Sequence, residues 1–212
     1  AAGRALIVNE DAADSEIYNI NFGYMGNPRT SPPFGVGEGR ETIFLDTVSG
    51  LSLSNLKFNG GTLPIFGQDC TELKMKGIQA ANIFGNGLLS ISGSPEFLLD
   101  SFSMVNDLAF SFTEDLLKLY ECDGAIIRNG LLDGSNSVDG YIFNFELSNN
   151  CLVEDVDLIH MGNGTLINDA FSTTCRNVRM RDFHSAGQGS RSAPANPELF
   201  SIEYTDVGAL SG

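Results

Sequence analysis

The stretch LSNLKF, residues 53–58, alternates apolar and polar residues on both sides of an asparagine at its third position. Alternation of this kind is typical of a β-strand with one buried face. Asparagine tolerates a left-handed backbone and bonds to its own main chain at turns. The pattern therefore predicts two short strands that meet at a bend, and we name it the bend motif.

The bend motif recurs along the chain at a nearly regular interval. The other copies are IYNINF (17–22), MKGIQA (75–80), LDSFSM (99–104), IRNGLL (127–132, with its fourth position slipped), VEDVDL (153–158) and MRDFHS (180–185, with its last position degraded). The middle residues all suit a turn, and they are Asn19, Asn55, Gly77, Ser101, Asn129, Asp155 and Asp182. Successive copies start 36, 22, 24, 28, 26 and 27 residues apart, a period typical of solenoid repeats.

A third strand precedes several copies of the motif, as in TIFLD (42–46), LLSIS (88–92), LLKLYE (116–121) and YIFNFE (141–146). Three strands per coil, stacked in register, predict an all-β, single-stranded parallel β-helix. We expect one domain over residues 1–212 with about seven coils of 22–28 residues, and an incomplete eighth that starts at ELFSIEY (198–204). Loop insertions are expected at 23–41, 133–140 and 186–198, where Gly, Pro, Ser and Asn accumulate.

The motifs and their period resemble the right-handed parallel β-helix of the pectin-lyase-like superfamily over residues 5–206. That superfamily includes pectate lyases, polygalacturonases, alginate epimerases and phage tailspikes. The resemblance implies right-handed winding and a polysaccharide that lies along the strand before the bend motif. No stretch matches the short catalytic signatures of polygalacturonases or alginate epimerases, so no catalytic residue is carried over from the family.

The charge balance limits the partners. The chain has 12 Lys and Arg against 27 Asp and Glu, for a net charge of −15, which opposes binding to nucleic acid. No apolar run approaches the roughly 18 residues that span a bilayer, so membrane insertion is not expected. Neither end of the coil stack has a capping segment in the sequence. A homo-oligomer such as a trimer, or neighbouring domains of a longer chain, is therefore expected to cover the ends.

The second position of the motif carries charges that alternate in sign from coil to coil. Its residues are Tyr18, Ser54, Lys76, Asp100, Arg128, Glu154 and Arg181. Because neighbouring coils lie about 4.8 Å apart, Arg181 is interpreted as the partner of Glu154, and the alternative is contact with a ligand. Arg179 has no acidic neighbour in this register and is expected to be the freer of the two.

The four cysteines are predicted to be free and mostly buried thiols. Cys70, Cys122 and Cys175 each precede a motif start by five residues, in a column of small residues where a serine coil separates them. The resulting spacing of about 9.6 Å exceeds the limit of about 7 Å between Cα atoms for a disulfide. Cys151 occupies another position. Free thiols favour folding in a reducing compartment.

The strand before the bend motif has two outward rows that suit a sugar chain. One reads Phe44, Phe66, Ser90, Lys118 and Asn144, and the other Asp46, Gln68, Ser92, Tyr120 and Glu146. Aromatic rings stack on the apolar face of a sugar, while amides and carboxylates bind its hydroxyls. The residues expected to bind substrate are Asp46, Phe44, Phe66, Gln68 and Asn144.

Cleavage of the sugar chain would require an acid or a base on the same surface. Glu146 is the candidate, helped by Lys118 or Tyr120 one coil away, and Asp115 or Asp139 can supply the second carboxylate that glycoside hydrolysis needs. Lyase chemistry needs a cation to neutralise an acidic sugar, and Lys118 is the one in this row. The alternative is that Glu146 and Lys118 simply pair across coils.

No cofactor is expected. Asp133, Ser135 and Asp139 offer oxygens for calcium, but no EF-hand or glycine-rich nonapeptide pattern is present, and a solvated turn is the alternative. The sequence favours a polysaccharide-binding β-helix that acts outside a cell or on a virion surface, with cleavage by a hydrolase or lyase left open. The alternative is a non-catalytic structural or adhesive segment of a virion fibre or surface assembly.

Overall fold

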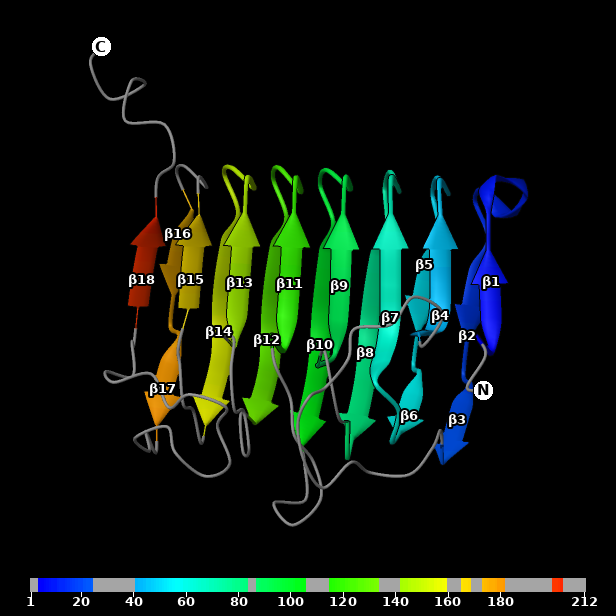
Figure 1. The fold of residues 1–212 in the computed structure, drawn as a ribbon, viewed down its shortest axis with the longest axis horizontal. Helices are drawn as coiled ribbons and strands as arrows, with labels where there is room; N and C mark the ends of the chain where they lie inside the picture. Colours follow the sequence, from blue (N-terminus) through cyan, green and yellow to red (C-terminus); the bar gives the residue numbers. More distant parts are fainter. Residues whose placement is uncertain are drawn as a thin grey trace.

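The computed structural model describes residues 4–24, 41–83, 87–105, 115–133, 142–159, 165–168, 173–181 and 200–203. Within these residues the chain is an all-β parallel solenoid, whose strands follow one another along its long axis from β1 to β18 (Figure 1). The one helical element there is a 3-10 turn, Glu10–Ala12. The prediction of a parallel β-solenoid is confirmed.

Sheet A contains the strand that precedes each bend motif. Its order is β1 (Leu6–Val8), β4 (Glu41–Asp46), β7 (Leu63–Gln68), β9 (Leu89–Ser92), β11 (Leu117–Tyr120), β13 (Phe143–Glu146), β15 (Thr165–Asn168) and β18 (Phe200–Glu203). Every neighbouring pair is parallel. The strands predicted within 42–46, 88–92, 116–121 and 141–146 correspond to β4, β9, β11 and β13.

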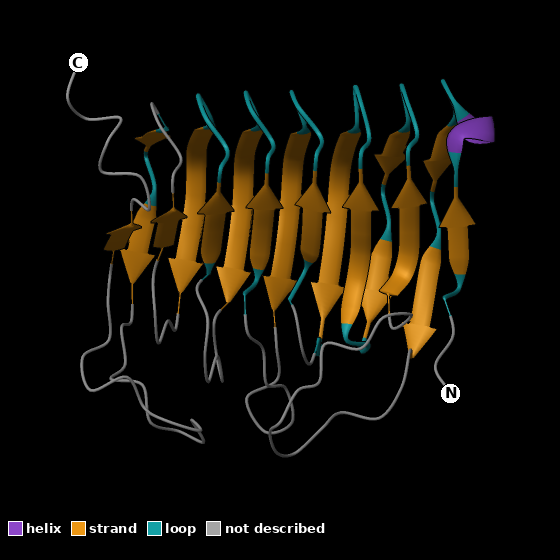
Figure 2. Cartoon of the chain, turned by 45° about the horizontal axis from the view of Figure 1, so that its top comes forward, coloured by secondary structure: helices purple, strands orange, loops and turns teal. Residues whose placement is uncertain are grey.

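Sheet B contains the two halves of the bend motif. Four long strands run through the bend: β8 (Lys74–Ala81), β10 (Leu98–Val105), β12 (Ile126–Asp133) and β14 (Leu152–Ile159). Toward the ends the halves are separate strands: β2 (Glu16–Tyr18) and β3 (Asn21–Tyr24), β5 (Ser52–Ser54) and β6 (Lys57–Asn59), β16 (Thr174–Arg176) and β17 (Arg179–Arg181). The strands of sheet B run opposite to those of sheet A, and the two sheets form two layers (Figure 2).

Each bend is made by a residue with a left-handed backbone. The φ angle lies between 50° and 69° at Asn19, Asn55, Gly77, Ser101, Asn129, Asp155 and Asn177. A Cβ atom on Gly77 would lie 2.7 Å from Asn55 Oδ1, so a larger residue here would require the Asn55 side chain to move. The first six residues are those that the sequence predicted.

The last bend motif is CRNVRM (175–180), and its predicted position at 180–185 is wrong. β16 pairs with Leu152–Glu154 and β17 with Asp157–Ile159, so Asn177 lies next to Asp155. The Nδ2 of Asn177 donates to Asp155 Oδ1 at 3.1 Å. Both stretches satisfy the same pattern five residues apart, and pairing with the preceding coil selects the first. Asp182 lies outside the described residues.

The motif at residues 127–132 keeps its register and is not slipped. Gly130 takes the inward fourth position, opposite Phe102 of the preceding coil. A Cβ atom on Gly130 would lie 2.1 Å from Cζ of Phe102. The phenyl ring therefore fills the space that an apolar side chain at residue 130 would occupy.

The core between the two sheets is filled by the inward residues of each coil. Sheet B contributes Leu53, Met75, Leu99, Ile127 and Val153, each at most 1% exposed. Sheet A contributes the fully buried Ile43, Ile65, Ile91, Leu119 and Phe145. Burial of one such side chain contributes roughly 1.5–3 kcal/mol, so this core holds the register and directs the alternate residues outward.

The corner from sheet A into sheet B has two further columns of left-handed residues. One contains Thr47, Asp69, Gly93, Glu121 and Leu147, with φ between 50° and 58°. The other contains Asp14, Gly50, Glu72, Glu96, Gly124 and Asn150, with φ between 53° and 72°. Between them lies the predicted column of small residues, in which Val48, Cys70, Ser94, Cys122 and Ser148 are all buried.

All four cysteines are free, as predicted, and Cys70, Cys122 and Cys151 are buried. Burial raises the pKa of Cys122 to about 12 and that of Cys151 to about 11. These thiols therefore stay protonated at neutral pH and are weak nucleophiles.

Cys175 is exposed. Because the last motif begins with it, Cys175 belongs to the first motif column and not to the column of small residues, which corrects the prediction.

The alternating charges of the second motif position stack as predicted from Lys76 to Glu154. Arg176 takes the place assigned to Arg181, because it pairs in register with Glu154. The predicted pairing of Arg181 with Glu154 is wrong, since Arg181 lies opposite Ile159.

Arg179 is not free either, contrary to the prediction. It lies in register with Asp157 of the preceding coil, and its Nε forms an ion pair with the Asp157 carboxylate. With the last motif starting at residue 175, Arg179 takes the outward fifth position, whose neighbour in the coil before is acidic. In the last coil Arg179 is thus paired with a carboxylate, and Arg176 lies in register with Glu154.

Most of the predicted insertions fall outside the described residues. The first was placed too wide, because β3 extends to Tyr24 and β4 begins at Glu41. Asp133, from the suggested calcium site, ends β12 and is buried. Ser135, Asp139 and the loop at 186–198 are not among the described residues. No described helix is long and apolar enough to cross a membrane.

Candidate functional site

The outward face of sheet A carries the two rows that the sequence predicts. Register pairs connect Phe44, Phe66, Ser90, Lys118 and Asn144 in one row, and Asp46, Gln68, Ser92, Tyr120 and Glu146 in the other. Neighbouring members are one strand spacing, about 4.8 Å, apart. We name this surface the sheet A face.

Aromatic side chains occupy the β4 and β7 end of the sheet A face. The rings of Phe44 and Phe66 stack, with centroids 5.7 Å apart and planes inclined by 6°. The guanidinium of Arg4 lies 3.7 Å from the ring centroid of Phe44, and Arg4 Nε is 3.0 Å from Glu41 Oε2. Phe44 is therefore enclosed between Arg4 and Phe66, whereas among the described residues the other face of the Phe66 ring is turned toward Ser90 of β9.

Asp46 and Gln68 form a hydrogen-bonded pair beside these rings. The Nε2 of Gln68 donates to Asp46 Oδ1 at 2.9 Å, and the hydroxyl of Thr47 donates to the same oxygen at 3.1 Å. Two donors on one carboxylate oxygen restrict the rotation of Asp46. The pair therefore presents a fixed arrangement of polar atoms in the row that continues at Ser92.

Lys118, Tyr120 and Glu146 lie together on β11 and β13. Lys118 Nζ is 2.8 Å from Glu146 Oε1, so these two residues pair across coils, as the structural alternative expected. Tyr120 is 36% exposed. The charge of Glu121 and a hydrogen bond to it raise the pKa of Tyr120, so its phenol remains a protonated donor at neutral pH.

Asn144 is not an exposed substrate contact, contrary to the expectation. It is 4% exposed, and its Nδ2 donates to Asp115 Oδ2 at 2.8 Å. Its Oδ1 is buried without a hydrogen-bond partner. Asn144 therefore acts on this face by orienting Asp115. Asp139, the other candidate for a second carboxylate, lies outside the described residues.

Ser90 and Ser92 of β9 are the shortest outward side chains of the sheet A face. They pair in register with Phe66 and Gln68 of β7, and with Lys118 and Tyr120 of β11. Two short hydroxyl side chains thus lie between β7 and β11, two strands roughly 9.6 Å apart that carry long side chains. We name Ser90 and Ser92 the serine segment.

Side chains of complementary kinds adjoin the serine segment. An aromatic face and an amide lie on the β7 side, and an ammonium, a phenol and a carboxylate lie on the β11 and β13 side. Such a set can stack on a sugar ring and bind its hydroxyls. Within the described ranges no group of three or more His, Cys, Asp and Glu residues can hold a metal ion.

The sequence predicted the rows but not the open side of Phe66 or the role of Arg4. Which face of a ring is covered depends on side-chain rotamers, which the repeat pattern does not contain. The two serines in consecutive outward positions of β9 were the available signal. Whether two serines leave room for a ligand depends on the long side chains of the neighbouring coils.

No family model and no curated protein matches the chain. Among solved structures it is similar to a protein from Parabacteroides merdae described as a glycosyl hydrolase, at 7% identity and a TM-score of 0.47, over 65% of this chain and 78% of that one. The catalytic domain of a GH87 α-1,3-glucanase in complex with tetrasaccharides is similar at 10% identity and a TM-score of 0.43, over 95% of this chain and 53% of that one. The same domain in complex with nigerose gives 9% identity and a TM-score of 0.40.

These structures are distant matches at the level of the β-helix. The chain spans about half the length of the glucanase domain. Membership of the pectin-lyase-like superfamily stays a prediction from the bend motifs.

Proposed function

We propose that the sheet A face binds a polysaccharide, with one sugar ring seated on the serine segment. The observation that carries this proposal is the ring of Phe66, which has one face against Phe44 and the other turned toward Ser90. An aromatic face beside short hydroxyl side chains suits the apolar face of a sugar. Stacking there removes both apolar surfaces from water.

Polar side chains on either side of the serine segment support the same proposal. Gln68 is held by Asp46, and the protonated phenol of Tyr120 faces it across β9. Both can bind hydroxyls at the rim of a stacked ring. Because the rows continue over several strands, the surface suits a chain of sugars. We place the protein's action outside a cell or on a virion surface, where such chains occur.

Cleavage would need two carboxyl groups at one glycosidic bond. Asp46 and Glu146 are four strand spacings, roughly 19 Å, apart, whereas the pair in glycosidases is separated by about 5–9.5 Å. This separation excludes Asp46 as the partner of Glu146. For a hydrolase we assign Glu146 with Asp115, whose carboxylate accepts from Asn144, two residues before Glu146. The substrate would displace Lys118 from Glu146. For a lyase we assign Lys118 to the negative charge of an acidic sugar.

The substitution Ser90→Phe tests the binding site. A third ring would continue the stack of Phe44 and Phe66 and cover the open face of Phe66, so we expect loss of polysaccharide binding in a folded protein. Ser54→Phe, on an outward row of sheet B, is the matched control and should leave binding unchanged. Retention of binding by Ser90→Phe would refute the placement on β9.

Incubation with neutral and acidic polysaccharides tests for cleavage. New reducing ends alone would indicate a hydrolase, and their loss in Glu146→Gln and Asp115→Asn would support the assigned pair. Reducing ends together with absorbance from unsaturated products would indicate a lyase, with Lys118→Met as the decisive variant. Binding without products would leave a non-catalytic glycan-binding protein.

A structural or adhesive segment is the second candidate function. The ion pairs Lys118–Glu146 and Arg128–Asp100 favour it, because they join neighbouring coils and need no ligand. This candidate predicts no binding to any glycan of a broad panel and lower stability on breaking either pair. For both candidates we propose a right-handed winding, which parallel crossovers strongly prefer, and about seven coils with an eighth begun at β18.

A further inference from the structure

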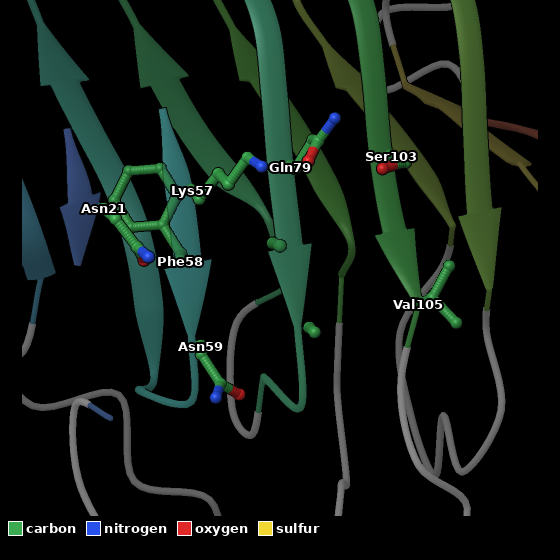
Figure 3. Close-up of a pocket in the computed structure, with 9 residues that line it drawn as sticks. Asn21, Lys57, Phe58, Asn59, Gln79, Ser103 and Val105 are labelled. Carbon is green, nitrogen blue, oxygen red and sulfur yellow. The ribbon is translucent and has the colours of Figure 1, made fainter. Parts of the chain in front are cut away.

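A groove of about 360 Å³ lies on the outward side of sheet B, apart from the sheet A face. It crosses β3, β6, β8 and β10 just after the bend, and Figure 3 shows its lining. The polar lining residues are Asn21, Lys57, Asn59, Gln79 and Ser103. The volume lies at the lower end of the range of small-ligand sites, about 300–1,000 Å³.

The groove results from the side-chain sizes in two neighbouring rows. Asn59, Ala81 and Val105 are register partners in one row, and Lys57 and Gln79 in the row beside it. The single methyl group of Ala81 lies between two longer side chains. The surface is therefore low at Ala81, and the polar ends of the neighbouring side chains surround this point.

Two polar side chains of the groove, Asn59 and Lys57, offer hydrogen-bond donors to a ligand. The Nδ2 of Asn82 donates to Asn59 Oδ1 at 3.2 Å, which occupies that oxygen and leaves the Asn59 amide N–H groups for a ligand. Lys57 is exposed, its register neighbours are Asn21 and Gln79, and it forms no ion pair with a described carboxylate. An ammonium and an amide donor without a negative partner favour an acceptor that carries charge.

We propose that this groove binds a sugar acid, that is, a small polyhydroxylated ligand with one carboxylate. Lys57 and the Asn59 amide bind the carboxylate, and Gln79 and Ser103 bind hydroxyls. Val105, which is 45% exposed, provides an apolar contact for the carbon ring. This site is separate from the serine segment, and it does not depend on the function proposed for the sheet A face.

Local charge favours an anion here although the chain as a whole carries −15. Charges farther away than about 8 Å are largely screened at physiological ionic strength. Among the described residues, the groove lining contains one ammonium and no carboxylate. Lys57 is the charged group of this described lining, so binding of an anion should weaken as salt is added.

Nuclear magnetic resonance tests the ligand class, with the side-chain amide signals of Asn59 and Gln79 as reporters. Glucuronate should shift both signals. Glucuronamide has the same ring without the charge, and acetate has the charge without the hydroxyls. Each should bind at least about tenfold more weakly than glucuronate, because a charge-assisted bond or several neutral hydrogen bonds are lost.

Variants test the place of binding. Lys57→Met should weaken glucuronate binding about tenfold or more and reduce its salt dependence. Lys74→Met is the matched control, because Lys74 is an exposed lysine of β8 before the bend and outside the groove. Ala81→Leu should block the groove. Ser90→Phe, on the sheet A face, should leave glucuronate binding intact, which separates this site from the one proposed above.

Each other outcome overturns a defined part of the proposal. Equal binding of glucuronamide would overturn the role of the carboxylate, and equal binding of acetate would overturn the role of the sugar. An equal effect of Lys57→Met and Lys74→Met would overturn the placement in the groove. Absence of any shift with the unmodified chain would overturn the proposal as a whole.

Discussion

Asp100, in the row of alternating charges at the second motif position, is a buried carboxylate with four hydrogen bonds. Its Oδ2 accepts from Arg128 Nε and Nη2 at 3.1 and 2.9 Å. Its Oδ1 accepts from Asn129 Nδ2 and from the Ser101 hydroxyl, both at 2.9 Å. The bond from Asn129, followed by those from Arg128 and Ser101, holds the pKa of Asp100 below its ordinary value despite its burial. Asp100 thus joins a bend to the next coil.

Asp100→Asn should lower the free energy of unfolding by about 1–2 kcal/mol at pH 7, because an amide turns an N–H group toward one of the donors that the carboxylate accepted. The lowered pKa means that the charge of Asp100 stabilises the fold above its ordinary pKa of 3.8, and that this contribution is lost as pH falls further. In urea titrations the difference between the two proteins should therefore be constant from pH 7 to about 5 and shrink below about pH 4.

Glu154→Gln is the matched control for this experiment. Glu154 is the other register neighbour of Arg128, but the ion pair of Arg128 is with Asp100. We expect a change of less than about 0.5 kcal/mol, as for most exposed charges. An Asp100→Asn effect that persists unchanged at pH 3, or one no larger than that of Glu154→Gln, would contradict the assigned role of Asp100.

At the scale of strands and turns, the residues at each corner decide how much could be predicted. The bend column consists of Asn, Asp, Ser and Gly, which signal a turn in the sequence itself. At the corner after sheet A, turn formers such as Asp69 and Gly93 share the column with Thr47, Glu121 and Leu147, which do not signal a left-handed backbone, so no turn column stands out in the sequence. Their conformation is imposed by the paired strands on both sides. Local sequence therefore predicted one corner and missed the other.

The pairing of β10 with β12 gives an element-scale prediction. Gly130→Ala should destabilise the protein by about 1–3 kcal/mol, because the new Cβ atom would lie 2.1 Å from Phe102 Cζ and the ring must move. In the double variant with Phe102→Leu, the smaller side chain makes room for the new Cβ atom. The loss of unfolding free energy should then be smaller than the sum of the two single losses, by about 0.5–3 kcal/mol. Urea denaturation of the four proteins measures this coupling.

Simple additivity of the two substitutions would contradict the packing of Phe102 over Gly130. It would instead support the slipped register that the sequence suggested for residues 127–132. Gly23→Ala is a suitable reference for the loss of a strand glycine alone. Gly23 in β3, like Gly130, has no left-handed φ angle, and no heavy atom lies within 4 Å of an added Cβ atom.

At the scale of the whole molecule, the repeat period determines which residues share a row, and this is why both rows of the sheet A face were predicted correctly. What those residues do depends on contacts that the period does not specify. Asn144 occupies an outward position by register yet is buried against Asp115, and Phe44 is enclosed by Arg4. The last coil was misplaced because CRNVRM and MRDFHS both fit the pattern, and only pairing with β14 distinguishes them.

A stack in which each coil contacts only its neighbours should be most protected where both neighbours are present. β10 pairs on both sides, with β8 and β12, and its Leu99, Phe102 and Met104 are buried, whereas among the described strands β2 pairs only with β5 and its Ile17 is partly buried. Hydrogen exchange followed by mass spectrometry should therefore show faster exchange at 16–22 than at 98–105, relative to the unfolded chain in urea. Equal protection in both segments would mean that the coils open together, so that the stability of one coil could not be separated from that of its neighbours.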